Sequence, residues 1–139
     1  MVTGGTIGIG FAIAERMAME GGIVHICSRK KENVETAVKA LTEKGLKVFG
    51  HQCNVSSKEQ RDAMVGAILQ KHDGVIDVLV CNAATALHQG KQLEIEERTY
   101  DKMYDLNVKS QFFLIKECIE GIRKSKSLGK SANIMIVSS

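Results

Sequence analysis

The chain has 139 residues, enough for one domain with a hydrophobic core of its own. Its 19 basic and 16 acidic residues leave a net charge of +3, and their dispersal argues against a nucleic-acid-binding protein. Although 44% of the residues are hydrophobic, no apolar run approaches a membrane span and no secretory signal opens the chain, so we expect a soluble, intracellular domain.

The chain opens with a short apolar run, M-V-T, followed by a glycine-rich segment at residues 3–10. A helix is predicted from Phe11 to Glu20, because Ile13, Ala14 and Met17 fall on one side of it. The apolar run I-V-H-I-C at residues 23–27 then predicts a second strand.

The next two helices are predicted from their apolar spacing. In residues 31–45 the apolar side chains follow the helical repeat and Gly45 supplies a stop. In residues 56–74 either Ser56 or Ser57 can cap the helix. Strands are predicted on both sides of the second of these helices, at residues 47–53 and 75–81.

A long helical stretch is predicted from Glu96 to Lys124, followed by a Gly/Ser/Lys loop and a last strand at residues 133–137. The helix carries aromatic residues, of which we interpret Tyr100 and Tyr104 as packing residues.

Strands and helices therefore alternate along residues 1–139, with no linker or second domain. This order predicts an α/β fold: a doubly wound parallel sheet of the Rossmann type in three layers, α-β-α. Because the first strand is shorter than central strands usually are, we expect a fragment, truncated after the fifth strand.

The four cysteines (Cys27, Cys53, Cys81 and Cys118) form no C-x-x-C pair, and the histidines are not spaced from them as zinc ligands are. We expect reduced, structural thiols and no metal site.

The segment T-G-G-T-I-G-I-G joins the first strand to the first helix. Glycine allows unusual backbone angles and close approach of a ligand, and the helix N-terminus offers N–H donors to a pyrophosphate. The G-x-G-x-x-G fingerprint is absent, because Ile13 stands where its third glycine would be. On this segment alone, a purely structural turn remains an alternative.

Three further motifs follow in order: C-N-A-A at residues 81–84, D-L-N-V-K-S at 105–110 and I-M-I-V-S-S at 134–139. Together with T-G-x-x-x-G-I-G, they resemble the short-chain dehydrogenase/reductase family over the whole chain. The resemblance implies an oxidoreductase that transfers a hydride between a nicotinamide cofactor and a carbonyl or alcohol substrate. Residues 28–38 with L-N-V-K-S are most similar to the NADPH-dependent carbonyl reductase branch, which includes peroxisomal-type retinal and carbonyl reductases.

The resemblance implies two catalytic residues. Ser139 would hydrogen-bond the carbonyl oxygen, and Asn107 would hold a water in the proton relay. The family carries a Tyr-x-x-x-Lys pair a dozen or so residues after the serine, so we expect the chain as written to be inactive. Without the other motifs, Ser138 and Ser139 would be interpreted as an exposed strand end.

The resemblance also implies a set of cofactor-binding residues, which come from the glycine turn and from the ends of the third and fourth strands. Where the family often has Asp after the third strand this chain has Asn54, whose amide oxygen would take over the contact to adenine. The set is Gly4, Thr6, Gly8, Ile9, Gly10, Asn54, Val55, Asn82, Ala83 and Ala84.

Cofactor choice depends on the end of the second strand, where NAD enzymes carry Asp or Glu for the ribose 2′-hydroxyl. This chain has Ser28 and Arg29 there, and Arg29 can bind a 2′-phosphate through charge-assisted hydrogen bonds. The alternative, a solvated basic helix start, is weakened because basic residues are disfavoured near helix N-termini. The sequence therefore favours NADP(H).

Two other functions remain as alternatives. One is a non-catalytic nucleotide-binding module that is complete as given; the other is a methyltransferase, which would want an acidic residue where Ser28 and Arg29 stand. For the oxidoreductase we expect a small-molecule carbonyl or alcohol substrate, no nucleic-acid or membrane partner, and a homo-oligomer formed through the long helix. We expect a cytoplasmic location; a peroxisomal one stays open, because its address would stand at a C-terminus beyond these residues.

Overall fold

Five parallel strands form one sheet in the order β3-β2-β1-β4-β5 in a computed structural model, which describes residues 1–138. The sheet confirms the predicted doubly wound arrangement, because the chain runs outward from β1 first through β2 and β3 and then through β4 and β5. The strands are β1 (Val2–Thr3), β2 (Val24–Ser28), β3 (Val48–Gln52), β4 (Val78–Cys81) and β5 (Asn133–Ile136).

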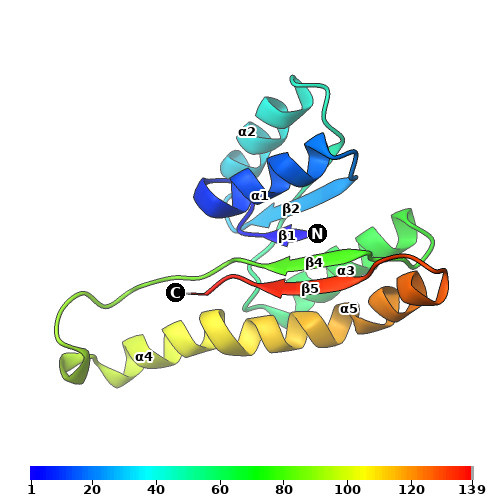
Figure 1. Ribbon diagram of the computed structural model, residues 1–139. Coiled ribbons are helices and arrows are strands. Elements are labelled where there is room, and N and C mark those ends of the chain that lie inside the picture. The colour runs from blue at the N-terminus through cyan, green and yellow to red at the C-terminus, as the bar shows by residue number, and fades with distance from the viewer. Residues whose placement is uncertain (139) are drawn as a thin grey trace.

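Helices cover both faces of the sheet (Figure 1). Helices α1 and α2 pack on one face, and α3 and α5 pack on the other. The helices are α1 (Gly8–Met19), α2 (Lys31–Thr42), α3 (Lys58–Lys71), α4 (Glu97–Tyr104) and α5 (Ser110–Ser127), with a short 3₁₀ helix at Gln92–Glu94. Within residues 1–138, no helix is both long and apolar enough to span a membrane.

The two faces of β2 illustrate why the layers form. Val24 and Ile26 are buried against α1 and α2, whereas His25 and Cys27 point to the α3 side, as the two-residue repeat of a strand requires. Strands buried on both faces are typical of parallel sheets. The core therefore divides into two clusters, one on each side of β1 and β2.

Two helix boundaries differ from the predicted ones. Helix α1 begins at Gly8 rather than Phe11, so its first turn lies inside the glycine-rich segment, which low helix propensity had excluded. The predicted helix from Glu96 to Lys124 is α4 and α5 joined by a π-helical turn at Asp105–Lys109, a wider turn that usually amounts to one inserted residue.

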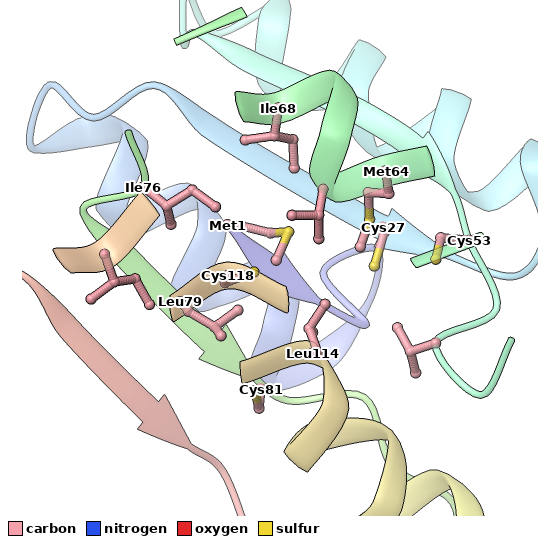
Figure 2. Close-up of a cluster of buried hydrophobic side chains, with 13 residues drawn as sticks. Met1, Cys27, Cys53, Met64, Ile68, Ile76, Leu79, Cys81, Leu114 and Cys118 are labelled. Carbon is pink, nitrogen blue, oxygen red and sulfur yellow. The ribbon is translucent and has the colours of Figure 1, made fainter. Parts of the chain in front are cut away.

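All four cysteines are free thiols in the cluster between the sheet, α3 and α5 (Figure 2). Burial raises the pKa of Cys81 to about 11 and that of Cys118 to about 12, so both are uncharged at neutral pH. These thiols pack as small hydrophobic side chains, as expected for reduced, structural cysteines.

Three histidines form a hydrogen-bonded chain on the α3 face of the sheet. Nδ1 of His25 lies 2.7 Å from Nε2 of His51 on β3, and Nε2 of His25 lies 2.8 Å from Nε2 of His72, just after α3. A neutral imidazole has one N–H, so His25 donates to one neighbour and accepts from the other. Burial, the two neighbouring histidines, the N-terminal amino group and Lys71 lower the pKa of His25 to about 3.

This pKa predicts that the chain loses stability in mild acid. The unfolded chain binds a proton at this histidine below pH 6.5 and the folded chain does not, so the free energy of unfolding should fall as pH drops from 6.5 toward 3. The fall is at most about 1.4 kcal/mol for each pH unit. Urea unfolding between pH 7.5 and 5 should show a shallower dependence for His25→Gln, which keeps one donor and one acceptor, than for the wild type.

The matched control is His88→Gln, which makes the same substitution at a histidine outside this chain of imidazoles. Equal slopes for the wild type and His25→Gln would contradict the prediction.

Candidate cofactor site

The glycine turn after β1 forms one wall of the candidate site. Gly4 has φ of +61°, which disfavours any side chain, and a Cβ there would lie 3.1 Å from the Ala83 Cα atom. At Gly10, a Cβ would overlap the carbonyl oxygen of Gly4 and the side-chain nitrogen of Asn82. The turn can therefore fold against α1 and the end of β4 only because these two positions carry no side chain.

Thr3 and Asn82 fasten the glycine turn to the end of β4. The Thr3 hydroxyl accepts hydrogen bonds from the backbone N–H groups of Asn82 and Ala83, both at 3.0 Å. The Asn82 side-chain amide donates to the carbonyl oxygens of Thr3, at 3.0 Å, and Gly4, at 3.2 Å. Asn82 therefore shapes the turn through its side chain.

A cleft of about 420 Å³ opens at this edge of the sheet, where the strands end. It brings together eleven of the residues predicted for cofactor binding: Gly4, Thr6, Ile9, Gly10, Ser28, Arg29, Asn54, Val55, Asn82, Ala83 and Ala84. Gly8 does not line it. Sites of open α/β sheets lie at the carboxyl ends of the strands, so this is the expected position for a ligand.

Six residues that were not predicted from the sequence also line the cleft. Cys27 and Cys53 lie at the ends of neighbouring strands, so their strand positions alone could have placed them here. Lys30 and Asn33 belong to the start of α2, and their closeness to Arg29 in the chain was the available signal. The remaining two are Ile7 and Leu106.

The basic end of the cleft lies where β2 passes into α2. Arg29 is exposed, its carbonyl oxygen accepts a 3.3 Å hydrogen bond from Gln52, and Lys30 stands beside it. Among the described residues that line the cleft, none is acidic. This end can therefore hold an anionic group without repulsion from a carboxylate.

The side chain of Asn54 is already engaged. Its Oδ1 atom accepts a 3.2 Å hydrogen bond from the backbone N–H of Ser56, the geometry of an Asx turn. The backbone N–H of Asn54 donates to Oε1 of Gln60 at 2.7 Å. The predicted contact from this amide oxygen to adenine would have to share the oxygen with Ser56.

Asn107 lies in the π-helical turn and outside the lining of the cleft. Its Oδ1 accepts from the Thr85 N–H, and its Nδ2 donates to the Thr85 carbonyl oxygen, both at 2.8 Å. The side chain therefore pins the segment that follows Ala84 to the long helix.

The predicted catalytic Ser139 lies outside the described residues. The N–H of Val137 donates a hydrogen bond to the Cys81 carbonyl oxygen, so the chain after β5 runs toward the Asn82 end of β4.

Neither a second hollow nor a metal centre coincides with this cleft in the described residues. A hollow of about 640 Å³ lies at the opposite edge of the sheet, where β2 and β4 begin, away from the glycine turn. No group of three or more metal-ligating side chains with suitable geometry occurs in residues 1–138.

The glycine packing yields a prediction. Gly10→Ala should lower the free energy of unfolding by about 1–3 kcal/mol, the usual cost of overpacking, because the new methyl group overlaps Gly4 and Asn82. Gly66→Ala is the matched control: Gly66 also lies in a helix, but a Cβ there meets nothing within 4 Å, and alanine should stabilise the helix. Thermal unfolding followed by circular dichroism compares the two, and an unchanged or higher midpoint for Gly10→Ala would count against this packing.

The chain is similar to known proteins both in sequence and in fold. A rabbit (Oryctolagus cuniculus) protein named dehydrogenase/reductase SDR family member 4 is 43% identical over 124 residues, 89% of this chain and 47% of its own. An actinorhodin polyketide ketoreductase variant, crystallised with NADPH, superposes with a TM-score of 0.87 at 31% identity over 99% of this chain and 51% of that one. A 3-ketoacyl-(acyl-carrier-protein) reductase from Brucella melitensis, complexed with NADH, gives 0.90 at 26% identity over 99% and 55%.

The chain spans about half the length of the curated relatives it matches. The family model described as short chain dehydrogenase matches residues 1–139, so the chain belongs to the short-chain dehydrogenase/reductase family.

Proposed function

We propose that these residues form the cofactor-binding part of an NADP(H)-dependent oxidoreductase that transfers a hydride between the cofactor and a carbonyl or alcohol substrate. One observation carries the proposal: the cleft at the strand ends combines a glycine cradle, in which a Cβ at Gly10 would overlap the turn, with a basic end at Arg29 and no acidic lining residue among those described. NADP(H) needs both features, since its pyrophosphate approaches backbone closely and its 2′-phosphate needs a cation.

Arg29 and Lys30 support NADP(H) over NAD(H). Of the two similar structures named above, one was determined with NADPH and the other with NADH, so likeness to them leaves the choice open. The choice therefore depends on the side chains at the end of β2, where a guanidinium can form charge-assisted hydrogen bonds to a phosphate.

The roles proposed for the chain's residues follow from the charge that develops in the reaction. Nicotinamide, when bound, supplies or accepts the hydride. As a carbonyl is reduced, negative charge gathers on its oxygen, where the Ser139 hydroxyl would donate a hydrogen bond. Asn107 would contribute to the proton relay from the π-helical turn that it pins to Thr85. The 139 residues contain no Tyr-x-x-x-Lys, the family's proton donor, so we expect no turnover from them alone.

Within the family we propose the NADPH-dependent carbonyl reductase branch, on the strength of residues 28–38 and Arg29 at the end of β2. A non-catalytic nucleotide-binding module is the second candidate, because Asn107 lies outside the lining of the cleft and both polar atoms of its side chain bond Thr85. The transcript beyond the codon for Ser139 separates the two candidates, because the enzyme requires Tyr-x-x-x-Lys there.

We also propose a cytoplasmic location for the oxidoreductase. Fluorescence microscopy of the tagged gene product tests it.

The cofactor preference can be measured by titration. We expect the chain to bind NADPH more tightly than NADH, and Arg29→Asp to abolish or reverse the preference. A charge-assisted contact contributes about 1.5–3 kcal/mol, equivalent to a roughly ten- to hundred-fold change in affinity. In the same solutions, NADPH should not be oxidised when an α-dicarbonyl is added.

Lys31→Asp is the matched control, because it makes the same charge change at a neighbouring residue that does not line the cleft. It should retain the preference for NADPH. Equal affinities of the wild type for NADPH and NADH would refute the proposed cofactor, and robust turnover by these 139 residues would show that the catalytic residues are misassigned.

We further propose that the long helix forms a surface for self-association. Tyr104 is 52% exposed, although the sequence predicted that it packs, and Phe112 is 64% exposed. Tyr100 stacks on Tyr104 with 6.3 Å between ring centroids, also largely exposed. Large exposed apolar side chains grouped along one element commonly mark an interface.

The double variant Tyr104→Glu, Phe112→Glu should shift the chain toward the monomer in sedimentation velocity experiments, since like charges would face each other in a symmetric interface. Met19→Glu, which changes an apolar side chain of similar exposure on α1, should leave the sedimentation coefficient of the wild type unchanged. A monomeric wild type at all concentrations would rule out this surface as a self-association site.

A further inference from the structure

The buried guanidinium of Arg61 is the feature that neither the cleft nor the proposed reaction yet explains. Arg61 lies in the first turn of α3 with 4% of its surface exposed. Its Nε and Nη2 atoms donate to the carboxylate of Glu117 on α5 at 3.0–3.2 Å, and its Nη1 atom donates to the backbone carbonyl of Val55 at 2.7 Å. The guanidinium carbon also lies 5.8 Å from the ring centroid of Phe113.

Burial of this charge has a physical cost that stability alone does not justify. An arginine is almost never fully buried unless paired, and a buried ion pair can often be replaced by apolar residues without loss of stability. What an apolar pair cannot do is donate a hydrogen bond to a carbonyl. The third contact, to Val55, is therefore the part of the arrangement that only the guanidinium supplies.

Val55 belongs to the turn between β3 and α3, and that turn forms a wall of the cleft. Asn54 and Val55 both line it. The turn is held at several points: the Asn54 carbonyl accepts from the N–H of Ser57 at 2.9 Å, and its N–H donates to Gln60. Arg61 adds the bond on the buried side, because the contact from Nη1 to the Val55 carbonyl is itself buried.

Glu117 connects this turn to the long helix. It lies on α5, which continues without interruption from the π-helical turn that contains Asn107. Its two oxygens accept two guanidinium nitrogens, which fixes the plane of the fork and the direction of Nη1. The position of the Val55 carbonyl is thus set relative to α5 as well as to α3.

We propose that Arg61, oriented by Glu117, is a positioning residue for the adenosine end of the cofactor site. It holds the Val55 carbonyl group, and with it the segment of Asn54 and Val55, in the position in which that segment forms the cleft wall. This inference depends on the proposed function, because it assumes that the cleft binds a dinucleotide. It assigns Arg61 no contact with the cofactor.

The test separates positioning from stability. In Arg61→Met with Glu117→Met, an apolar pair replaces the ion pair, so stability should be close to that of the wild type while the Val55 carbonyl loses its donor. We expect the dissociation constants of NADPH and of 2′,5′-ADP to rise about tenfold together. Isothermal titration calorimetry measures both, at a temperature where circular dichroism shows the variant folded.

Two further variants complete the experiment. Arg61→Lys keeps the charge but loses the planar fork, and should weaken both ligands by a few-fold. Ser125→Ala removes a hydrogen bond from the buried Ser125 to Asp77 at the far end of α5, and should lower stability without changing either dissociation constant. If the double variant fails to fold, Arg61→Lys measured against Ser125→Ala decides the question.

The outcomes distinguish this inference from the proposal beneath it. Wild-type affinity for 2′,5′-ADP in the folded Arg61 variants would overturn the inference and leave the proposed function standing. If the wild type binds neither NADPH nor 2′,5′-ADP, the proposed function fails and the inference fails with it. Weaker binding in the Arg61 variants and unchanged binding in Ser125→Ala would support both.

Discussion

The hydrogen bonds between Thr3 and Asn82 are the constraint on which the cleft depends. β1 has two residues and pairs with β4 at one register position, Val2 opposite Val80, so the sheet ladder alone holds its end weakly. The Thr3 hydroxyl and the Asn82 side-chain amide add the missing support, because together they bond five backbone groups at the point where the chain turns. The glycines then allow α1 to begin directly above this point.

The parts of the molecule that could be predicted from the sequence are those set by local patterns. Apolar runs and helical spacing act locally, so the strands, the helices and the parallel order follow from them. The strand ends follow too, which is why Arg29, Asn54 and Asn82 were placed correctly at one edge of the sheet. Residues next to a predicted one in the chain, such as Lys30, could have been added on the same grounds.

Other features depend on partners distant in the chain, and a single sequence carries no signal for them. In the sequence, Arg61 resembles an exposed helix residue. Only the fold brings Glu117 of α5, 56 positions away, into contact with it. The bond between His25 and His72 likewise requires α3 to end over β2. The start of α1 at Gly8 was missed for a different reason: glycine lowers helix propensity, but packing against the end of β4 decides where this helix begins.

The π-helical turn is the point at which the long helix can accept a change in length. A turn of this kind contains one residue more than an α-helix would use, and the surplus is absorbed between Asp105 and Lys109. Deleting one residue there would restore regular α-helix and leave α4 and α5 in nearly the same orientation about the helix axis, because the turn already absorbs the extra residue. A deletion within α5 would instead rotate the residues on its two sides by about 100° relative to each other. A one-residue change in length should therefore be tolerated at this turn more readily than within α5.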